Sequence, residues 1–164
     1  MGKNRLMMLD IIANNDWKRP IYFTGGSYSD DEYIWMRDYL QLDGLAYKLV
    51  PIRTPIDKDN PYDMGRIDSD LMYKIVKSWD WGNMDDPNIY HDPETRRNSI
   101  VFRGNLARLT ETLINEGKIQ KAKDILDLAT KRIPVSHFGY YFTVEPFITG
   151  YYQAVSYTHL TLPT

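Results

Sequence analysis

The sequence predicts a mainly helical α+β protein that is built from two parts. A β-branched and aromatic run, Pro20–Thr24, is followed by two glycines, and a second apolar run spans Leu45–Val50. Runs of this kind, bounded by glycine and proline, are typical of strands. Beyond these two runs, apolar residues recur at helical spacing. We therefore expect a small α/β lobe over residues 1–64 and a helical lobe over residues 65–155.

The composition restricts the function classes. The chain has 164 residues, 43% of them hydrophobic, so it can bury a core. Twenty basic residues stand against twenty-two acidic ones with no basic block, which argues against a nucleic-acid surface. The lack of cysteine excludes disulfides, thiolate catalysis and cysteine-based zinc sites. No run approaches the roughly 18 apolar residues of a membrane span, and Asp10 interrupts the first apolar patch, so we expect no signal peptide.

The first lobe is expected to be a β-α-β unit preceded by a helix. Residues 5–14 are apolar almost all round, which predicts a helix buried on most sides and indicates an excised piece of a larger protein. Ser29 and Glu32 have capping-box spacing, so a second helix is expected over Asp30–Gln41. A helix between two strands favours a short parallel strand pair.

The second lobe is expected to contain a helical hairpin. Residues 51–66 hold three prolines among charged residues and are typical of a linker. A helix is expected after Asp68. Asp92 followed by Pro93 is a strong signal for the start of another helix.

Helices over Pro93–Asn115 and Ile119–Ile133 would form a hairpin about Gly117. Eight residues fall at the relative spacings of the 34-residue tetratricopeptide pattern: Leu106, Leu109, Leu113, Gly117, Ala122, Leu126, Ala129 and Pro134. A helix over Val144–Ala154 would then begin the next repeat.

The last segment, residues 156–164, is expected to be a non-native tail. Its threonines and Pro163 should break the helix that a second repeat requires. The string also resembles translated read-through of a sequencing adapter at the end of a metagenomic gene. His159 therefore carries no functional weight.

Candidate chemistry is sparse. The loop Thr24–Ser27 follows a strand, as anion-binding loops do, but it lacks the lysine of a P-loop, and a tight turn explains its glycines equally well. The acidic stretch Asp57–Asp63 starts like a calcium loop, yet proline occupies a ligand position, so a solvated loop is expected. His91 and His137 show no metal-ligand or triad spacing and are interpreted as structural. We expect no catalytic residue, no metal and no cofactor.

The remaining candidates are aromatic. Thirteen Tyr, five Phe and four Trp indicate either a core of large side chains or a surface for sugars or peptides. Trp17, Arg19 and Tyr28 lie around the first strand and are the candidate ligand-binding residues. The aromatic residues between Tyr140 and Tyr152 are expected to form a packing surface, since one repeat cannot bury its own faces.

Several motifs resemble the soluble C-terminal part of a bacterial membrane-protein family. The most specific are Asn14–Phe23 and Tyr39–Pro51. Trp81–Met84 and the hairpin from Asn105 to Pro134 are also similar, and the resemblance covers residues 4–155. Members of that family carry an N-terminal membrane domain that is protein O-mannosyltransferase-like, hence of glycosyltransferase type.

The resemblance implies a periplasmic accessory region that is membrane-associated only as part of the full-length protein. The family's catalytic carboxylates belong to loops of the membrane domain, and no residue here matches them, so no enzymatic activity is expected of this region. It would brace that membrane domain, its partner in the same chain, or bind an acceptor protein or glycan. The alternative is a structural helical-repeat scaffold that recruits a protein partner.

Overall fold

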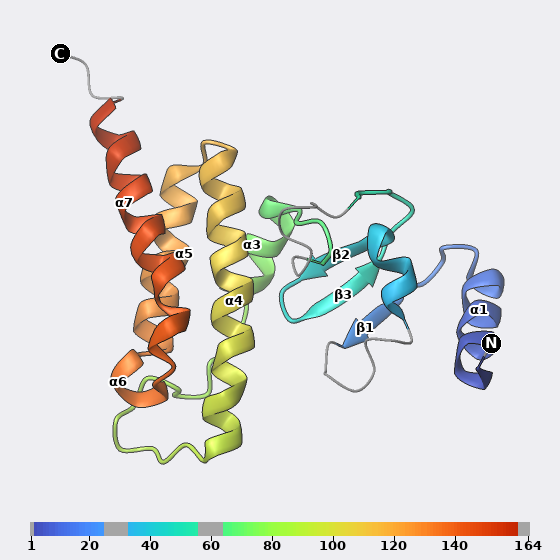
Figure 1. Cartoon of the computed structure of the whole chain (residues 1–164), viewed down its shortest axis with the longest axis horizontal. Helices are drawn as coiled ribbons and strands as arrows, with labels where there is room; N and C mark the ends of the chain where they lie inside the picture. The colour runs from blue at the N-terminus through green and yellow to red at the C-terminus, as the bar shows by residue number, and fades with distance from the viewer. Residues whose placement is uncertain (1, 25–32, 56–63, 161–164) are drawn as a thin grey trace. The chain divides into compact units, whose positions relative to one another are not determined.

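The structure is a computed structural model that describes residues 2–24, 33–55 and 64–160, with side chains described as far as residue 155. The chain divides into two compact units, Met1–Asp68 (unit 1) and Ser69–Thr164 (unit 2). Figure 1 shows a small antiparallel sheet in unit 1 and a group of helices in unit 2. The predicted mainly helical α+β class is thereby confirmed.

The described residues of unit 1 include the helix α1, a 3₁₀ helix and a three-stranded sheet of order β1-β3-β2. In chain order its elements are α1 (Lys3–Asn15), β1 (Tyr22–Thr24), η1 (Ile34–Tyr39), β2 (Leu40–Asp43) and β3 (Ala46–Leu49). Both strand pairs are antiparallel, with Phe23 and Leu42 each opposite Tyr47.

The predicted parallel pairing is therefore wrong, and so is the described part of the predicted helix over Asp30–Gln41. The chain forms only the short η1 and then becomes extended as β2, a strand that helical periodicity concealed. Gly44, with a φ of 72°, turns β2 directly into β3. Because this turn reverses the chain, β3 runs antiparallel to both of its neighbours.

The core of unit 1 is small and aromatic. Tyr33, Met36, Leu40 and Leu49 are buried together. Phe23 stacks on Tyr33 with ring centroids 4.9 Å apart. These side chains close one face of the sheet, and Met8 and Ile12 of α1 pack against the same cluster.

The helix predicted over residues 5–14 is confirmed as α1, but its predicted burial is wrong. None of its residues is buried, and Leu6, Met7 and Ile11 are each more than half exposed. Only the side that carries Met8 and Ile12 reaches the core cluster. The apolar character of the other sides is thus unexplained by packing within unit 1.

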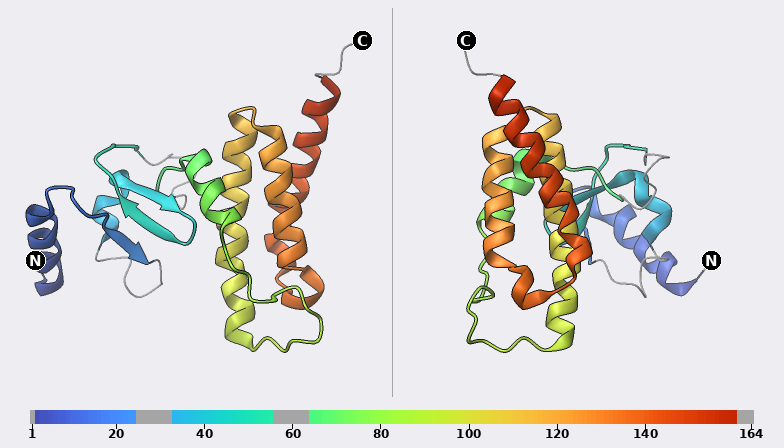
Figure 2. Two further views of the ribbon diagram at one scale, coloured as in Figure 1. Left: turned by 180° about the vertical axis from the view of Figure 1, so that it is seen from behind. Right: turned by 60° about the vertical axis from the view of Figure 1, so that its left-hand side comes forward.

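Unit 2 is helical, and Figure 2 shows α4, α5 and α7 side by side. Its elements are α3 (Ser69–Lys77), α4 (Pro93–Asn115), α5 (Ile119–Arg132), α6 (Val135–Phe138), η2 (Tyr141–Thr143) and α7 (Glu145–Leu160). The Asp92 carboxylate accepts hydrogen bonds from the Glu94 and Thr95 amides at 2.8 and 3.0 Å, which confirms the predicted helix start.

The predicted hairpin of α4 and α5 is confirmed, and Gly117 between them has a φ of 73°. The tetratricopeptide-spaced apolar residues form its core: Leu106, Leu109, Leu113, Ala122 and Leu126 are fully buried, and Ala129 is nearly so. α7 packs closely on this pair. A Cβ added at Gly150 would lie 3.2 Å from Leu126 Cδ2 and 3.3 Å from Thr110 Cγ2.

α7 continues to Leu160, so the helix break expected from residue 156 onward is wrong. Threonine lowers helix propensity by only a few tenths of a kcal/mol per residue, and Pro163 lies beyond the last helical residue. Among the described helices, none has the length and apolar character needed to cross a bilayer.

Candidate functional site

Two of the residues predicted to bind a ligand, Trp17 and Arg19, lie in the turn between α1 and β1. Both side chains are exposed, Trp17 by 57%. Asp16 and Trp17 have φ values of 48° and 56°, left-handed conformations that cost a non-glycine residue on the order of 1 kcal/mol. The Asn15 Nδ2 group donates to the Arg19 carbonyl at 2.8 Å and closes the turn. Tyr28, the third predicted residue, lies outside the described residues.

Next to this turn, α1 and β1 form an apolar groove of about 340 Å³. We call it the α1–β1 groove; its lining residues are Asn4, Met7, Met8, Ile11, Ile12, Ile21, Tyr22 and Phe23. Met7 and Ile11 are each 58% exposed on its rim. The sequence pattern indicated an apolar helix here but gave no sign that this side would stay exposed.

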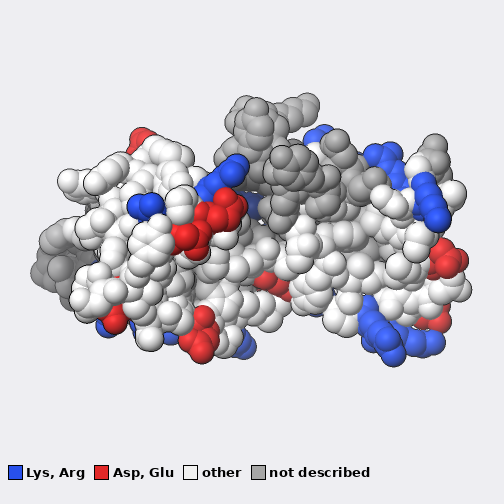
Figure 3. Space-filling view, turned by 90° about the horizontal axis from the view of Figure 1, so that it is seen from below, with Lys and Arg blue, Asp and Glu red and all other residues white. Residues whose placement is uncertain are grey.

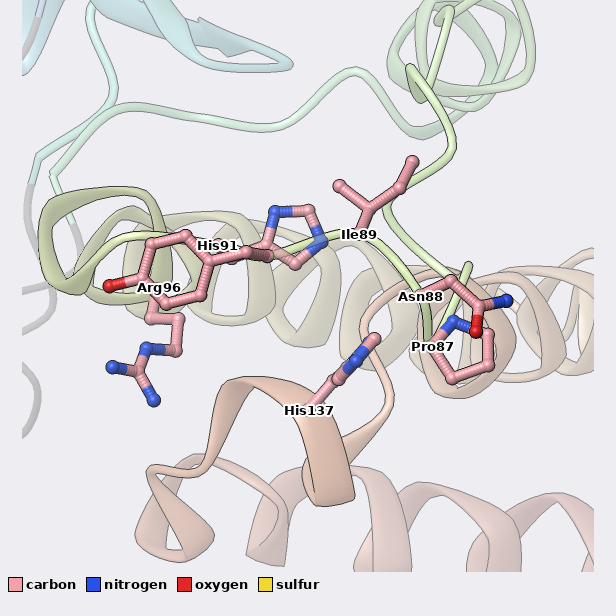
Figure 4. A pocket seen from close by; sticks show the side chains of 7 residues that line it. Pro87, Asn88, Ile89, His91, Arg96 and His137 are labelled. Atoms are coloured by element: carbon pink, nitrogen blue, oxygen red, sulfur yellow. The ribbon is translucent and has the colours of Figure 1, made fainter.

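Unit 2 carries a different, mixed pocket of about 310 Å³ beside the start of α4. Figure 4 shows two of its lining residues, His91 on the loop before α4 and His137 on α6. Their ring centroids lie 5.6 Å apart and their planes are perpendicular. Arg96 also lines the pocket, together with Tyr90, which is 79% exposed.

The two histidines were interpreted as unrelated from sequence, and the fold brings them together. His91 stacks on Phe138 with a centroid distance of 4.9 Å, which supports a packing role. Its Nε2 atom is buried without a hydrogen-bond partner among the described residues. In the part of the chain that is described, no three His, Cys, Asp or Glu side chains are grouped to hold a metal ion. Among the described residues, the pair thus has no third His, Cys, Asp or Glu with which to hold a metal ion.

A serine–lysine–glutamate cluster in unit 2 has the residue types of a nucleophilic site. Lys118 Nζ donates to Ser69 Oγ at 2.9 Å, and Ser69 Oγ donates to Glu116. Lys118 also pairs with Glu116 at 2.7 Å and with Asp70 at 2.8 Å. No sequence pattern revealed this cluster, since its members come from α3 and from the α4–α5 turn.

The electrostatics of this cluster favour a structural role. Hydrogen bonds to Asp70 and Glu116 raise the pKa of Lys118 above its usual range, so it stays a cation and cannot take a proton from Ser69. Ser69 is only 2% exposed, which denies a substrate access to its hydroxyl. The cluster attaches α3 to the α4–α5 turn.

Arg103 of α4 is a buried cation, 2% exposed. Its Nη1 donates to the Gly139 carbonyl at 2.7 Å and to Thr143 Oγ1 at 2.9 Å, and its Nη2 donates to the Ile133 carbonyl at 2.9 Å. Burial lowers the pKa of Arg103. All its described partners belong to the segment that joins α5 to α7, so its donors are used in holding that connection.

Two further sequence candidates cannot be placed. Gly25, Gly26 and Ser27 of the predicted anion-binding loop lie outside the described residues, and so does the acidic stretch Asp57–Asp63.

Comparison with known proteins gives one finding. Residues 1–71 match a family model described as TMEM260-associated domain 2. The match contains the whole of unit 1 and ends within α3. This description indicates a membrane-protein family. No curated protein and no solved structure matches the chain.

Proposed function

We propose that this chain is a non-catalytic accessory region of a glycosyltransferase-like membrane protein, on the periplasmic side of the bilayer. The observation that carries the proposal is the match of residues 1–71 to a membrane-protein family, because the matched segment contains a complete compact unit. The resemblance of Asn14–Phe23 and Tyr39–Pro51 to the soluble part of bacterial mannosyltransferase-like proteins supports the finer description. Both motifs lie in unit 1.

The role we propose is to brace the membrane domain of the same protein or to bind its acceptor, a protein or a glycan. The turn that carries Trp17 and Arg19 supports acceptor binding. Backbone strain at two successive residues persists only where the surroundings maintain it, and such strain is concentrated at functional sites. Here the strained turn carries an aromatic and an arginine side chain that are both exposed to solvent.

The test is binding of the full chain to a glycan array and to immobilised peptides. Trp17→Ala should weaken binding at least about tenfold, as expected for loss of an aromatic anchor worth about 1.4 kcal/mol or more. Trp35→Ala is the matched control, because Trp35 is 47% exposed in the same unit. Equal losses in the two variants would contradict a site at Trp17. Hydrolase or transferase activity of the isolated chain would contradict the non-catalytic role.

A second candidate function is a helical-repeat scaffold that recruits a protein partner. One observation favours it: beside the tetratricopeptide-like hairpin, Tyr141, Phe142 and Tyr152 are each at least 69% exposed. Aromatic side chains of this kind are enriched at protein interfaces. Under this alternative, Tyr141→Ser with Phe142→Ser abolishes peptide binding and Trp17→Ala leaves it unchanged. The leading proposal predicts the opposite pattern.

A further inference from the structure

The pocket beside the start of α4 gathers polar side chains that have no polar partner in the described part of the protein. Arg96 of α4, His91 of the preceding loop and His137 of α6 all line it, as Figure 4 shows. Among the described residues, none of these three side chains forms a hydrogen bond or an ion pair. Arg103 and Lys118, also in unit 2, are by contrast each held by several acceptors. The donors of this pocket are therefore available to a ligand.

Most of the nitrogen atoms of these three side chains can be reached. Nε2 of His91 is buried, and the other imidazole and guanidinium nitrogens are not. The rings of His91 and His137 have their centroids 5.6 Å apart, so one bound group can contact both when each hydrogen bond spans about 2.8 Å. Arg96 and His137 are thus the main contacts that the pocket offers, with His91 as the third.

The described lining of the pocket carries a positive charge and no carboxylate. Besides the arginine and the two histidines it consists of Pro87, Asn88, Ile89 and Tyr90. Each polar side chain of this set can donate a hydrogen bond. Donors without acceptors favour a ligand that brings acceptor oxygens, above all ionised ones, because hydrogen bonds to ionised groups are the stronger kind.

The acidic residues that are close in sequence already have donors of their own. Asp92 caps α4 and accepts from the Glu94 and Thr95 amides, and Asp86 accepts from the Asn88 side chain at 3.0 Å. Figure 3 views unit 2 from the end where α6 and the loop before α4 lie, and blue and red side chains are both scattered there over mostly white surface. The positive charge is therefore local to the pocket and is not part of a broad basic face.

The size and chemistry of the pocket select among small ligands. Its volume of about 310 Å³ is about ten times the roughly 30 Å³ that one water molecule occupies in the liquid. A metal cation would meet the charge of Arg96 and would find only two imidazoles among the described residues. Ile89 and Tyr90, 37% and 79% exposed, border the pocket with apolar surface, so a bound anion can belong to a larger molecule.

We propose that this pocket binds an oxyanion, a carboxylate or a phosphate group that belongs to a small ligand. Arg96 would pair with the charge, and His137 and His91 would donate to the remaining oxygens. The proposal goes beyond the proposed function, because it concerns unit 2 and does not depend on the turn at Trp17. For the bare ion we expect a dissociation constant in the millimolar range, since only a few hydrogen bonds hold it.

The experiment is titration of the full chain with sodium phosphate, sodium glucuronate and glucose at constant ionic strength. Phosphate represents a phosphate group, glucuronate a carboxylate on a sugar, and glucose a similar sugar without charge. One or both anions should shift the imidazole NMR signals of His91 and His137, which are assigned by substituting each histidine, and glucose should not. Because a ligand that binds only the folded chain stabilises it, the same anion should raise the melting temperature.

Arg96→Gln should weaken binding of that anion at least about tenfold, as expected for the loss of charge-assisted hydrogen bonds. Arg97→Gln is the matched control, because Arg97 is the next residue on α4, with a side chain that is 70% exposed and lies 3.9 Å from Glu94. This control should bind within about twofold of the parent chain, since an exposed charge contributes little.

His137→Phe is a second variant that acts on the other main contact. It keeps an aromatic ring against His91 and Phe138 and removes both nitrogens. Anion binding should weaken about fivefold, as expected for one lost hydrogen bond to a charged group. Circular dichroism shows whether each variant is folded, and Arg96→Gln decides alone if His137→Phe is not.

Three outcomes would overturn the proposal: no shift of either imidazole signal with phosphate or glucuronate, an equal response to glucose, or equal losses in the Arg96 and Arg97 variants. Equal losses would show attraction to the general surface charge of α4. None of these measurements involves Trp17, so this proposal and the proposed function fail separately.

Discussion

In unit 2, Leu106, Leu109, Leu113 and Leu126 are fully buried where α4, α5 and α7 pack together, whereas α1 of unit 1 leaves Leu6, Met7 and Ile11 largely in solvent. The helices of both regions carry apolar residues but use them differently. In unit 2, the apolar side of one helix packs against the apolar side of a neighbouring helix. In unit 1, one side of α1 packs against the core cluster and another side stays more than half exposed.

This difference separates apolar residues that stabilise the fold from those that are available for binding. Helical spacing of apolar residues correctly identifies the residues that stabilise the fold when two amphipathic helices follow each other closely. The short turn between such helices brings their apolar faces together. A single helix next to a small sheet has more apolar surface than the sheet can cover. Its excess surface is then a candidate interface.

The largest expected effect tests this difference directly. Leu109→Ala should lower the free energy of unfolding of unit 2 by about 3 kcal/mol, because Leu109 is fully buried and the substitution leaves a cavity. Leu6→Ala, at a 55% exposed position, should change it by less than about 0.5 kcal/mol. Urea denaturation followed by far-ultraviolet circular dichroism measures both.

Amide hydrogen exchange tests whether a substitution in one unit destabilises that unit alone. If the two units unfold separately, Leu109→Ala should speed amide exchange in α5 and leave β3 unchanged. Leu40→Ala, in the fully buried part of unit 1, should do the reverse. A uniform increase across both units in either variant would show that the units unfold together.

A smaller loss of stability is expected from Arg103→Met, which keeps an unbranched aliphatic stem but removes the guanidinium group and its hydrogen bonds. The carbonyls of Ile133 and Gly139 would lose their guanidinium donor inside unit 2, at a cost of about 2 kcal/mol. Arg97→Met is the control, because Arg97 lies on the exposed side of the same helix and is paired only at 3.9 Å with Glu94. Thermal melting of the two variants provides the comparison, and equal shifts would contradict the role assigned to Arg103.

Two glycine substitutions in unit 2 should act in opposite directions. Gly117→Ala places a Cβ at a φ of 73° and should cost about 1 kcal/mol, even though no atom lies within 4 Å of the added carbon. Gly104→Ala, inside α4 and also without close neighbours, should stabilise the protein by about 0.5–1 kcal/mol. Stabilisation by both, measured as shifts of the denaturant midpoint, would show that the α4–α5 turn does not require a left-handed residue.

The smallest effect depends on pH. Hydrogen bonds from Lys118 and Lys121 lower the pKa of Asp70 from 3.8 to about 2. Because the folded-state pKa is lowered, the contribution of Asp70 is complete above about pH 4 and is lost as the pH falls toward 2. With Asp70→Asn, the melting temperature should therefore fall less steeply between about pH 4 and about pH 2. Between about pH 6 and about pH 7 it should differ from that of the parent chain by a constant amount. An unchanged slope below pH 4 would contradict the pairing.

Sequence reasoning located the helices of unit 2 to within one residue for α4 and α5 because caps, glycine and periodicity agreed there. It failed for β2, where Leu40 and Leu42 fit either a helix face or an alternating strand, and pairing with β3 decided the outcome. It also failed for the direction of β1 and β3, which depends on that same missed strand. Trp17 and Arg19 were predicted from the sequence to bind a ligand, and that role stays a prediction. The contact between His91 and His137 could not be predicted, because only the fold brings these two residues together.

Arg103 has one more consequence, which concerns the length of the connection between α5 and α7. Its guanidinium holds Ile133, Gly139 and Thr143 at fixed distances, and Gly139 and Tyr140 adopt left-handed φ values within the same segment. An insertion or deletion of a single residue there would move a carbonyl out of reach and rotate the start of α7. Gly82 and Asn83, in an exposed turn of the long loop before α4, also have left-handed φ values, but their hydrogen bonds within the described chain are local, to Asp80 and from Asp86, and tie no distant helix. A peptide tag or reporter should therefore be tolerated at that loop and rejected at the connection.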